Sequence, residues 1–118
     1  MNNKVIDLED VLERVQNDWE LLFELFDIFE QDFIVKKPMC DDLFSRQEFE
    51  KLRDIAHSLK GAAGNISTKK LFDSFYQIEK LSEERTPEQI PAILKAVDKQ
   101  FAEFQAAKEQ LKKEHNPS

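Results

Sequence analysis

Cysteine, glycine and proline are scarce in this chain of 118 residues. The one cysteine, Cys40, has no partner for an internal disulfide and offers no cysteine pair for zinc, which suits a reducing compartment. Two glycines and four prolines stand against ten phenylalanines, and this composition favours long helices over a turn-rich sheet. We therefore expect an all-α, cytoplasmic protein.

Positive charge and long apolar runs are also lacking. Lysine and arginine number 17 against 24 aspartate and glutamate residues, so the formal net charge of -7 would repel nucleic acid and anionic membrane surfaces. No stretch reaches the roughly 20 apolar residues of a membrane span, and Met1–Asp10 lacks the features of a secretion signal. We expect one soluble domain over residues 1–118, with no nucleic-acid or membrane partner.

Apolar residues recur at helical spacing near the N-terminus in a short segment and then in a long one. The first predicted helix covers Asp7–Val15, with Asp7 as its N-cap. The second runs from Asp18 to about Lys37, with Asn17 as its N-cap and Pro38 ending or kinking it.

Three further segments begin at capping signals. A capping box at Ser45–Glu48 opens a helix that runs to about Asn65. The next predicted helix starts after Ser67 or Thr68 and fades near Glu84. The last one follows Thr86, Pro87 and Gln89 and carries an apolar seam from Ile90 to Leu111. Four long helices with short connections predict an up-and-down four-helix bundle at about residues 6–113, with the short first helix as a lid or flank and frayed ends, Asn116–Ser118 among them. Its apolar stripes can be satisfied within one bundle, so we expect a monomer.

The second helix has a broader apolar surface than one packing seam requires. Leu21 and Ile28 lie to one side of its main stripe, while Phe23 and Ile34 lie to the other. This surface either contacts the short first helix or forms a docking patch.

Gly61 and Gly64, the two glycines, follow His57 by four and seven residues within a helical segment. A glycine inside a helix costs roughly 1 kcal/mol against alanine, so their placement suggests close approach of a partner or an anion. At 100° per residue His57 points away from the core, on the same side as Arg53 and Lys60. These residues form a small basic spot on an acidic domain.

A solvent-facing imidazole is partly neutral at cellular pH and offers a nucleophilic nitrogen. Lys60 could neutralise the oxygens of a phosphoryl group on that nitrogen, and Arg53 adds a second positive charge. An inert surface histidine is the alternative for His57 taken alone. A metal or haem site is weaker, because His115 lies in a ragged tail, and no serine elbow supports a hydrolase. The abundant carboxylates are most simply solvated surface.

The run from Ala56 to Ile66, AHSLKGAAGNI, resembles the signature of histidine-containing phosphotransfer (HPt) domains, which is His, any residue, Leu, Lys, Gly within an Ala-rich helix. The layout is similar over roughly Ile6 to Lys108. The resemblance implies that His57 is phosphorylated, that Lys60 stabilises the phosphoryl group and that Gly61 keeps the site open. Where the family often has Gly and Ala after Ile66, this chain has Ser67 and Thr68, which could cap the next helix or contact a partner. Gln77 and Glu79 receive no firm role.

The resemblance further implies a carrier, without kinase activity or bound cofactor, that exchanges phosphoryl groups with aspartates of receiver domains in response regulators and hybrid sensor kinases. Mg²⁺ is then expected in the receiver. We expect docking to use Leu21, Phe23 and Ile28 together with Arg53, Gly64, Ser67 and Thr68. The alternatives are a helical adaptor that binds a receiver or another protein and never carries phosphate, and a metal-storage bundle, for which the inward Glu and His residues are missing.

Overall fold

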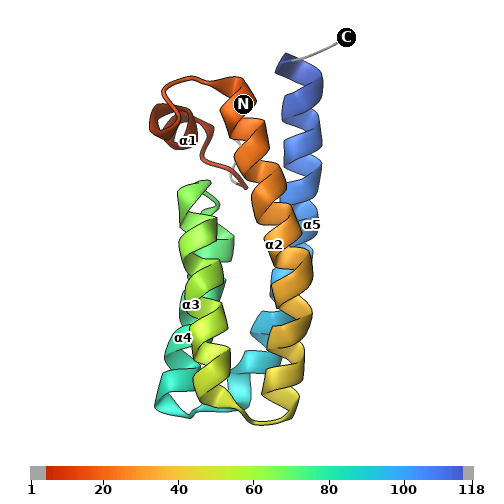
Figure 1. Cartoon of the computed structure of the whole chain (residues 1–118). Coiled ribbons are helices and arrows are strands. Elements are labelled where there is room, and N and C mark those ends of the chain that lie inside the picture. Colours follow the sequence, from red (N-terminus) through yellow and green to blue (C-terminus); the bar gives the residue numbers. More distant parts are fainter. Residues whose placement is uncertain (1–4, 116–118) are drawn as a thin grey trace.

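The computed structural model describes residues 5–115, and over this range it is helical without strands (Figure 1). The elements are α1 (Leu8–Arg14), α2 (Trp19–Ser45), α3 (Phe49–Asn65), α4 (Lys69–Glu84), the short 3-10 helix η1 (Pro87–Gln89) and α5 (Ile90–His115). The all-α prediction is therefore confirmed. The predicted fraying of Asn116–Ser118 falls outside the described residues.

α2, α3, α4 and α5 run alternately down and up, which is the predicted four-helix topology (Figure 1). α2 and α5 extend beyond the shorter α3 and α4, and α1 lies over the end that the shorter pair leaves uncovered. Ile6, Val11 and Val15 are buried where the α1 region covers this end of the bundle. The Asp7 amide donates to the Ser67 carbonyl at 2.9 Å, which ties α1 to the turn between α3 and α4.

Phenylalanines fill the centre of the bundle between α2 and α5. Phe104 is fully buried and meets Phe26 and Phe29 edge-on, with ring centroids 5.4 and 5.3 Å away. Phe33 and Phe101 stack at 3.8 Å. Buried aromatic pairs in these geometries contribute beyond their area alone, so this cluster is the main apolar contact that joins α2 to α5.

α2 does not end at Pro38, and its N-cap is not Asn17. Asp18 is the cap and accepts from the Leu21 amide, whereas Asn17 lies in the preceding turn with φ 63°. Proline inside a helix removes one hydrogen bond and costs about 3 kcal/mol. The helix continues because Cys40 and Leu43 prolong its buried stripe. Burial raises the pKa of the Cys40 thiol to about 12, so this cysteine is an unreactive core residue.

The predicted caps of α3 and α5 are wrong, although both helices exist. Ser45 is the last residue of α2, the chain reverses through Gln47 with φ 58°, and Glu48 precedes α3 without a side-chain capping bond. Thr86 likewise makes no capping bond, and Pro87 opens η1 rather than α5. α4 begins after Thr68 as predicted. α3, α4 and η1 therefore begin without a side-chain capping bond.

Two buried lysines hold α2 and α5 together. Lys37 of α2 donates to Asp41 and to Asp98 of α5, both at 3.0 Å. Lys108 of α5 pairs with Glu30 and Asp27 of α2. Burial alone would lower the pKa of both ammonium groups, but the bonded carboxylates raise it instead, so both lysines stay charged.

The Glu30→Gln variant is expected to be less stable than the wild type by roughly 1 kcal/mol at pH 7. Burial tends to raise the pKa of Glu30, but bonds from Lys108 and Gln105 hold it below 4.5. Stability from a lowered carboxyl pKa is present above the unfolded-state value and is lost as pH falls through the folded-state value. Urea denaturation at several pH values should therefore show the two proteins converging below about pH 4.5. A gap that does not change with pH would contradict this role of the ionised carboxylate.

Candidate functional site

His57 lies in the middle of α3 and points into solvent, as predicted. Its side chain is 67% exposed, whereas Leu52, Ala56 and Leu59 of the same helix are buried. The imidazole is thus presented on the outside of the bundle, on a helix that is fixed by its opposite face. A reacting group from another molecule can reach the ring without any opening of the core.

Glu79 of α4 holds one nitrogen of this ring. Its Oε2 lies 2.9 Å from His57 Nδ1. Burial tends to raise the pKa of Glu79, but contacts with Lys60 and His57 outweigh it and hold the pKa below 4.5. An ionised carboxylate only accepts hydrogen bonds, so Nδ1 carries the hydrogen and donates it. In the neutral ring the lone pair is therefore on Nε2, the outward nitrogen.

Lys60 is held by the other oxygen of the same carboxylate. Its Nζ lies 2.8 Å from Glu79 Oε1, and its side chain is only 18% exposed. Oε1 is buried, so the Lys60 ammonium is its charged partner in the fold. The Nζ also lies over the Tyr76 ring, 5.4 Å from its centroid. The ammonium is thus confined beside the imidazole.

The predicted basic spot is charge-balanced in the structure. Arg53 donates to its neighbour Asp54 at 2.9 Å, and Lys60 faces Glu79. Both cations therefore have anionic partners, and the site carries no uncompensated positive patch from these two residues. A phosphoryl group on His57 would have to compete with Glu79 for Lys60.

The two glycines differ in what surrounds them. A Cβ at Gly61 would meet nothing within 4 Å, so this position leaves open space one turn after His57. At Gly64 a Cβ would lie 3.2 Å from Cδ2 of Phe72. Gly64 therefore lets α3 approach α4, and its predicted role in docking stays a prediction.

Three other predicted docking residues are engaged inside the fold. Ser67 is buried and its hydroxyl donates to Asp10 at 2.6 Å, while the buried Thr68 hydroxyl donates to the Ala63 carbonyl at 2.8 Å. Phe23 is half-buried and packs near Trp19 and Phe26. The Ser67 and Thr68 side chains are therefore buried, whereas the Phe23 ring remains partly exposed.

The tail that was expected to be ragged is ordered through His115. This residue ends α5, and its ring stacks on Trp19 with centroids 3.8 Å apart.

Among the described residues no three His, Cys, Asp or Glu side chains converge to hold a metal ion. No helix in residues 5–115 is long and apolar enough to cross a membrane.

Lys36 of α2 also lies next to the site and was not predicted. Its Nζ donates to the hydroxyl of Ser58, the residue after His57, at 2.9 Å, and it pairs with Asp32 at 3.2 Å. The Lys36–Ser58 hydrogen bond sets which turn of α2 lies next to the His57 region of α3. The prediction missed it because the contact joins two helices, and the pattern of either helix does not fix how they are rotated against each other.

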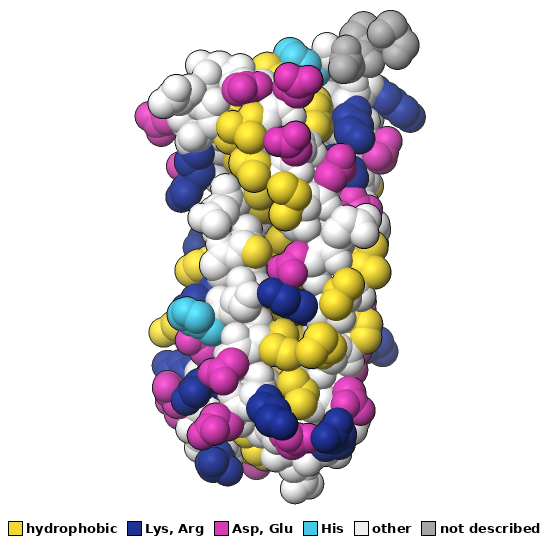
Figure 2. All heavy atoms as spheres, viewed as in Figure 1, with side chains coloured by type: hydrophobic (Ala, Val, Ile, Leu, Met, Phe, Trp, Pro, Cys, Tyr) yellow, Lys and Arg dark blue, Asp and Glu magenta, His cyan; other side chains and the backbone are white. Residues whose placement is uncertain are grey.

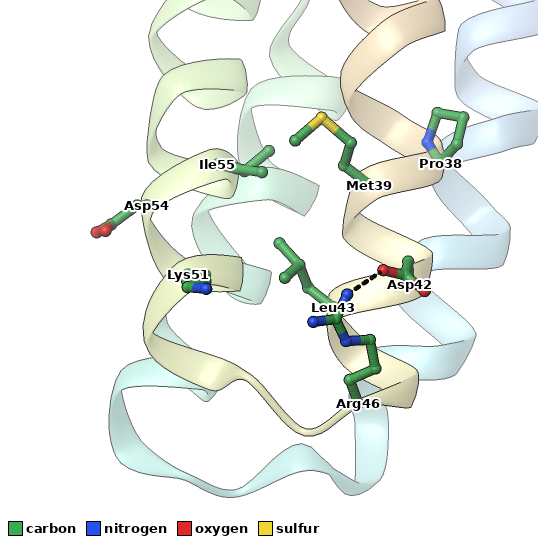
Figure 3. A pocket seen from close by; sticks show the side chains of 8 residues that line it. All are labelled: Pro38, Met39, Asp42, Leu43, Arg46, Lys51, Asp54 and Ile55. Atoms are coloured by element: carbon green, nitrogen blue, oxygen red, sulfur yellow. Dashed lines mark hydrogen bonds and ion pairs between the residues drawn. The ribbon is translucent and has the colours of Figure 1, made fainter.

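A groove between α2 and α3 opens about one turn from His57 (Figure 3). Its volume is about 600 Å³. Met39 and Ile55 point toward one another across it, and Leu43 lies below them in this view. Charged side chains line its lower part, where Arg46 pairs with Asp42 at 3.0 Å. The groove thus offers an apolar surface close to the imidazole.

The chain matches the Hpt domain family over residues 5–113. It therefore belongs to the histidine-containing phosphotransfer domains, which act as phosphotransfer modules in phosphorelay signalling and interact with receiver domains. Members of this family are phosphocarriers rather than kinases. Neither the search of curated proteins nor the search of solved structures found a match.

Proposed function

We propose that this protein carries a phosphoryl group on Nε2 of His57 and exchanges it with aspartates of receiver domains. The observation that carries the proposal is the shared carboxylate of Glu79, which binds His57 Nδ1 at 2.9 Å and Lys60 Nζ at 2.8 Å. One anion thereby orients the nucleophile and keeps a cation beside it. An adaptor that never carried phosphate would have no use for this arrangement.

In the accepting direction, the Nε2 lone pair attacks the phosphorus of an aspartyl phosphate in line. The N–P bond forms as the P–O bond to the aspartate breaks, and the electron pair leaves with the aspartate carboxylate. The Nδ1 proton stays directed at Glu79, which stabilises the positive charge that develops on the ring. Lys60 neutralises the phosphoryl oxygens, and the space at Gly61 admits the incoming group.

The reverse steps deliver the phosphoryl group to another receiver. The donor is an acyl phosphate, so this chain needs no nucleotide and acts as a carrier. Any Mg²⁺ would be held by the receiver. The single cysteine leads us to place the exchange in the cytoplasm.

The test is incubation of the protein with a receiver domain carrying labelled phosphate. We expect label on this chain that acid removes and base does not, and peptide mapping should place it on the segment that contains His57. A complex with the receiver that forms without any such label, for several receivers, would favour the adaptor.

The docking face that we propose surrounds His57 on the α2 side. Val35 and Met39 are 63% and 46% exposed, and the lower of the two groups of hydrophobic side chains that Figure 2 shows on this face lies over the lower half of α2. Lys36, which bonds to Ser58, places both at the level of the histidine. Leu21 lies about 22 Å further along α2 at about 1.5 Å per residue, so it falls at the edge of, or outside, a standard interface centred on His57.

The Met39→Asp variant is expected to slow phosphoryl transfer from a receiver about tenfold or more, because it places a desolvated charge in the docking face. Leu21→Asp likewise replaces an exposed apolar side chain of α2 by a carboxylate and should leave the rate within about twofold. The measurement is the rate of label transfer at a receiver concentration below saturation. Equal slowing by both variants, or by neither, would contradict the proposed face.

A further inference from the structure

Tyr76 is an exposed aromatic residue next to the site, and the proposed transfer mechanism gives it no role. It is 45% exposed on α4, three residues before Glu79. Residues three apart on a helix lie side by side, so the Tyr76 ring and the Glu79 carboxylate are neighbours on the surface of α4. The Lys60 ammonium from α3 touches both, at 5.4 Å from the ring centroid and 2.8 Å from Oε1.

A lysine side chain at a surface normally samples many rotamers, and its ordering must be offset by contacts. The Glu79 carboxylate holds the ammonium from one side, with Nζ 2.8 Å from Oε1. The space at Gly61 on the same face is open. The aromatic face is the second contact that limits where the ammonium can go, and cations are attracted to such faces.

We infer that Tyr76 is a positioning residue that keeps the Lys60 ammonium beside the His57 imidazole, so that the cation is in place when a phosphoryl group arrives. This inference rests on the proposed function. It assigns the effect to the π face of the ring and not to the hydroxyl. Tyr76→Phe should therefore behave as the wild type, whereas Tyr76→Leu should not.

The experiment uses phosphoramidate, a small donor that needs no docking surface. The Nε2 lone pair bonds to phosphorus, the P–N bond of the donor breaks, and the donor nitrogen leaves as ammonia with the protons that it already carries. The rate of phosphohistidine formation is followed by ³¹P NMR. Tyr76→Leu is expected to lower this rate about two- to fivefold, the effect of an exposed cation–π contact. Because the side chain is largely exposed, urea denaturation should show little change in stability.

Dependence on Lys60 separates positioning from other roles. In a Lys60→Met background, Tyr76→Leu should have no further effect on the rate, since there is no ammonium to place. An unchanged or faster rate for Tyr76→Leu, the same loss for Tyr76→Phe, or a full effect in the Lys60→Met background would each overturn the inference. Failure of the wild type to form any phosphohistidine would instead overturn the proposed function.

Discussion

The His57→Gln variant is expected to fold as the wild type does and to accept no phosphoryl group. Glutamine keeps a polar side chain of similar size, but it has no lone pair that can form the N–P bond. Loss of a covalent nucleophile reduces such reactions by on the order of a thousandfold or more, so label from a phosphorylated receiver should fall below detection. The side chain is 67% exposed, and the free energy of unfolding should change by less than about 1 kcal/mol.

The chain provides its own matched control. His115 is the other histidine, and His115→Gln makes the identical change at the end of α5, where the ring stacks on Trp19. This variant should accept label at the wild-type rate. Label that persists in His57→Gln and disappears in His115→Gln would show that the wrong histidine has been assigned.

The part of the site that the sequence predicted lies on one helix. His57, Lys60 and Gly61 share a face of α3, and their relation follows from helical periodicity alone. Glu79 and Tyr76 belong to α4, 22 and 19 residues after His57. Their contact with His57 and Lys60 depends on how two helices are rotated against each other, which the pattern of either helix does not fix. The sequence offered one signal for Glu79: it directly follows Ile78, a residue of the buried face of its helix.

The helices were predicted in number and order, but several of their ends were not. The rule about proline placed the end of the second helix near Pro38, and the capping-box rule placed the start of the third helix at Ser45. In the structure α2 continues to Ser45 itself. A cap contributes about 1 kcal/mol and an internal proline costs about 3 kcal/mol. Burying Leu43 on the extended helix contributes about 1.5–3 kcal/mol, and burial of the smaller Cys40 side chain adds to it, so together they offset these amounts. Tertiary burial thus outweighed the local signals.

Phe104→Ala is expected to lower the free energy of unfolding by about 3–5 kcal/mol, the largest stability loss that we predict. Phe104 is fully buried and packs edge-on against Phe26 and Phe29, with Phe101 6.0 Å away. Removing its ring takes away these contacts and leaves a cavity between α2 and α5. Domains of this kind are stable by about 5–15 kcal/mol, so the variant should remain folded only marginally. Urea denaturation with a fixed m-value would measure the loss.

The same variant separates stability from chemistry. His57, Lys60 and Glu79 lie on α3 and α4, whereas the rings around Phe104 belong to α2 and α5 (Figure 1). At low temperature, where most molecules are folded, the rate of phosphoryl acceptance per folded molecule should therefore stay near the wild-type value. Phe104→Leu, which keeps most of the apolar volume, should cost less than about 1.5 kcal/mol. A loss below 1 kcal/mol for Phe104→Ala would mean that the α2 and α5 contact is loosely packed. A loss of chemistry without a loss of stability would mean that the phenylalanine cluster positions the site.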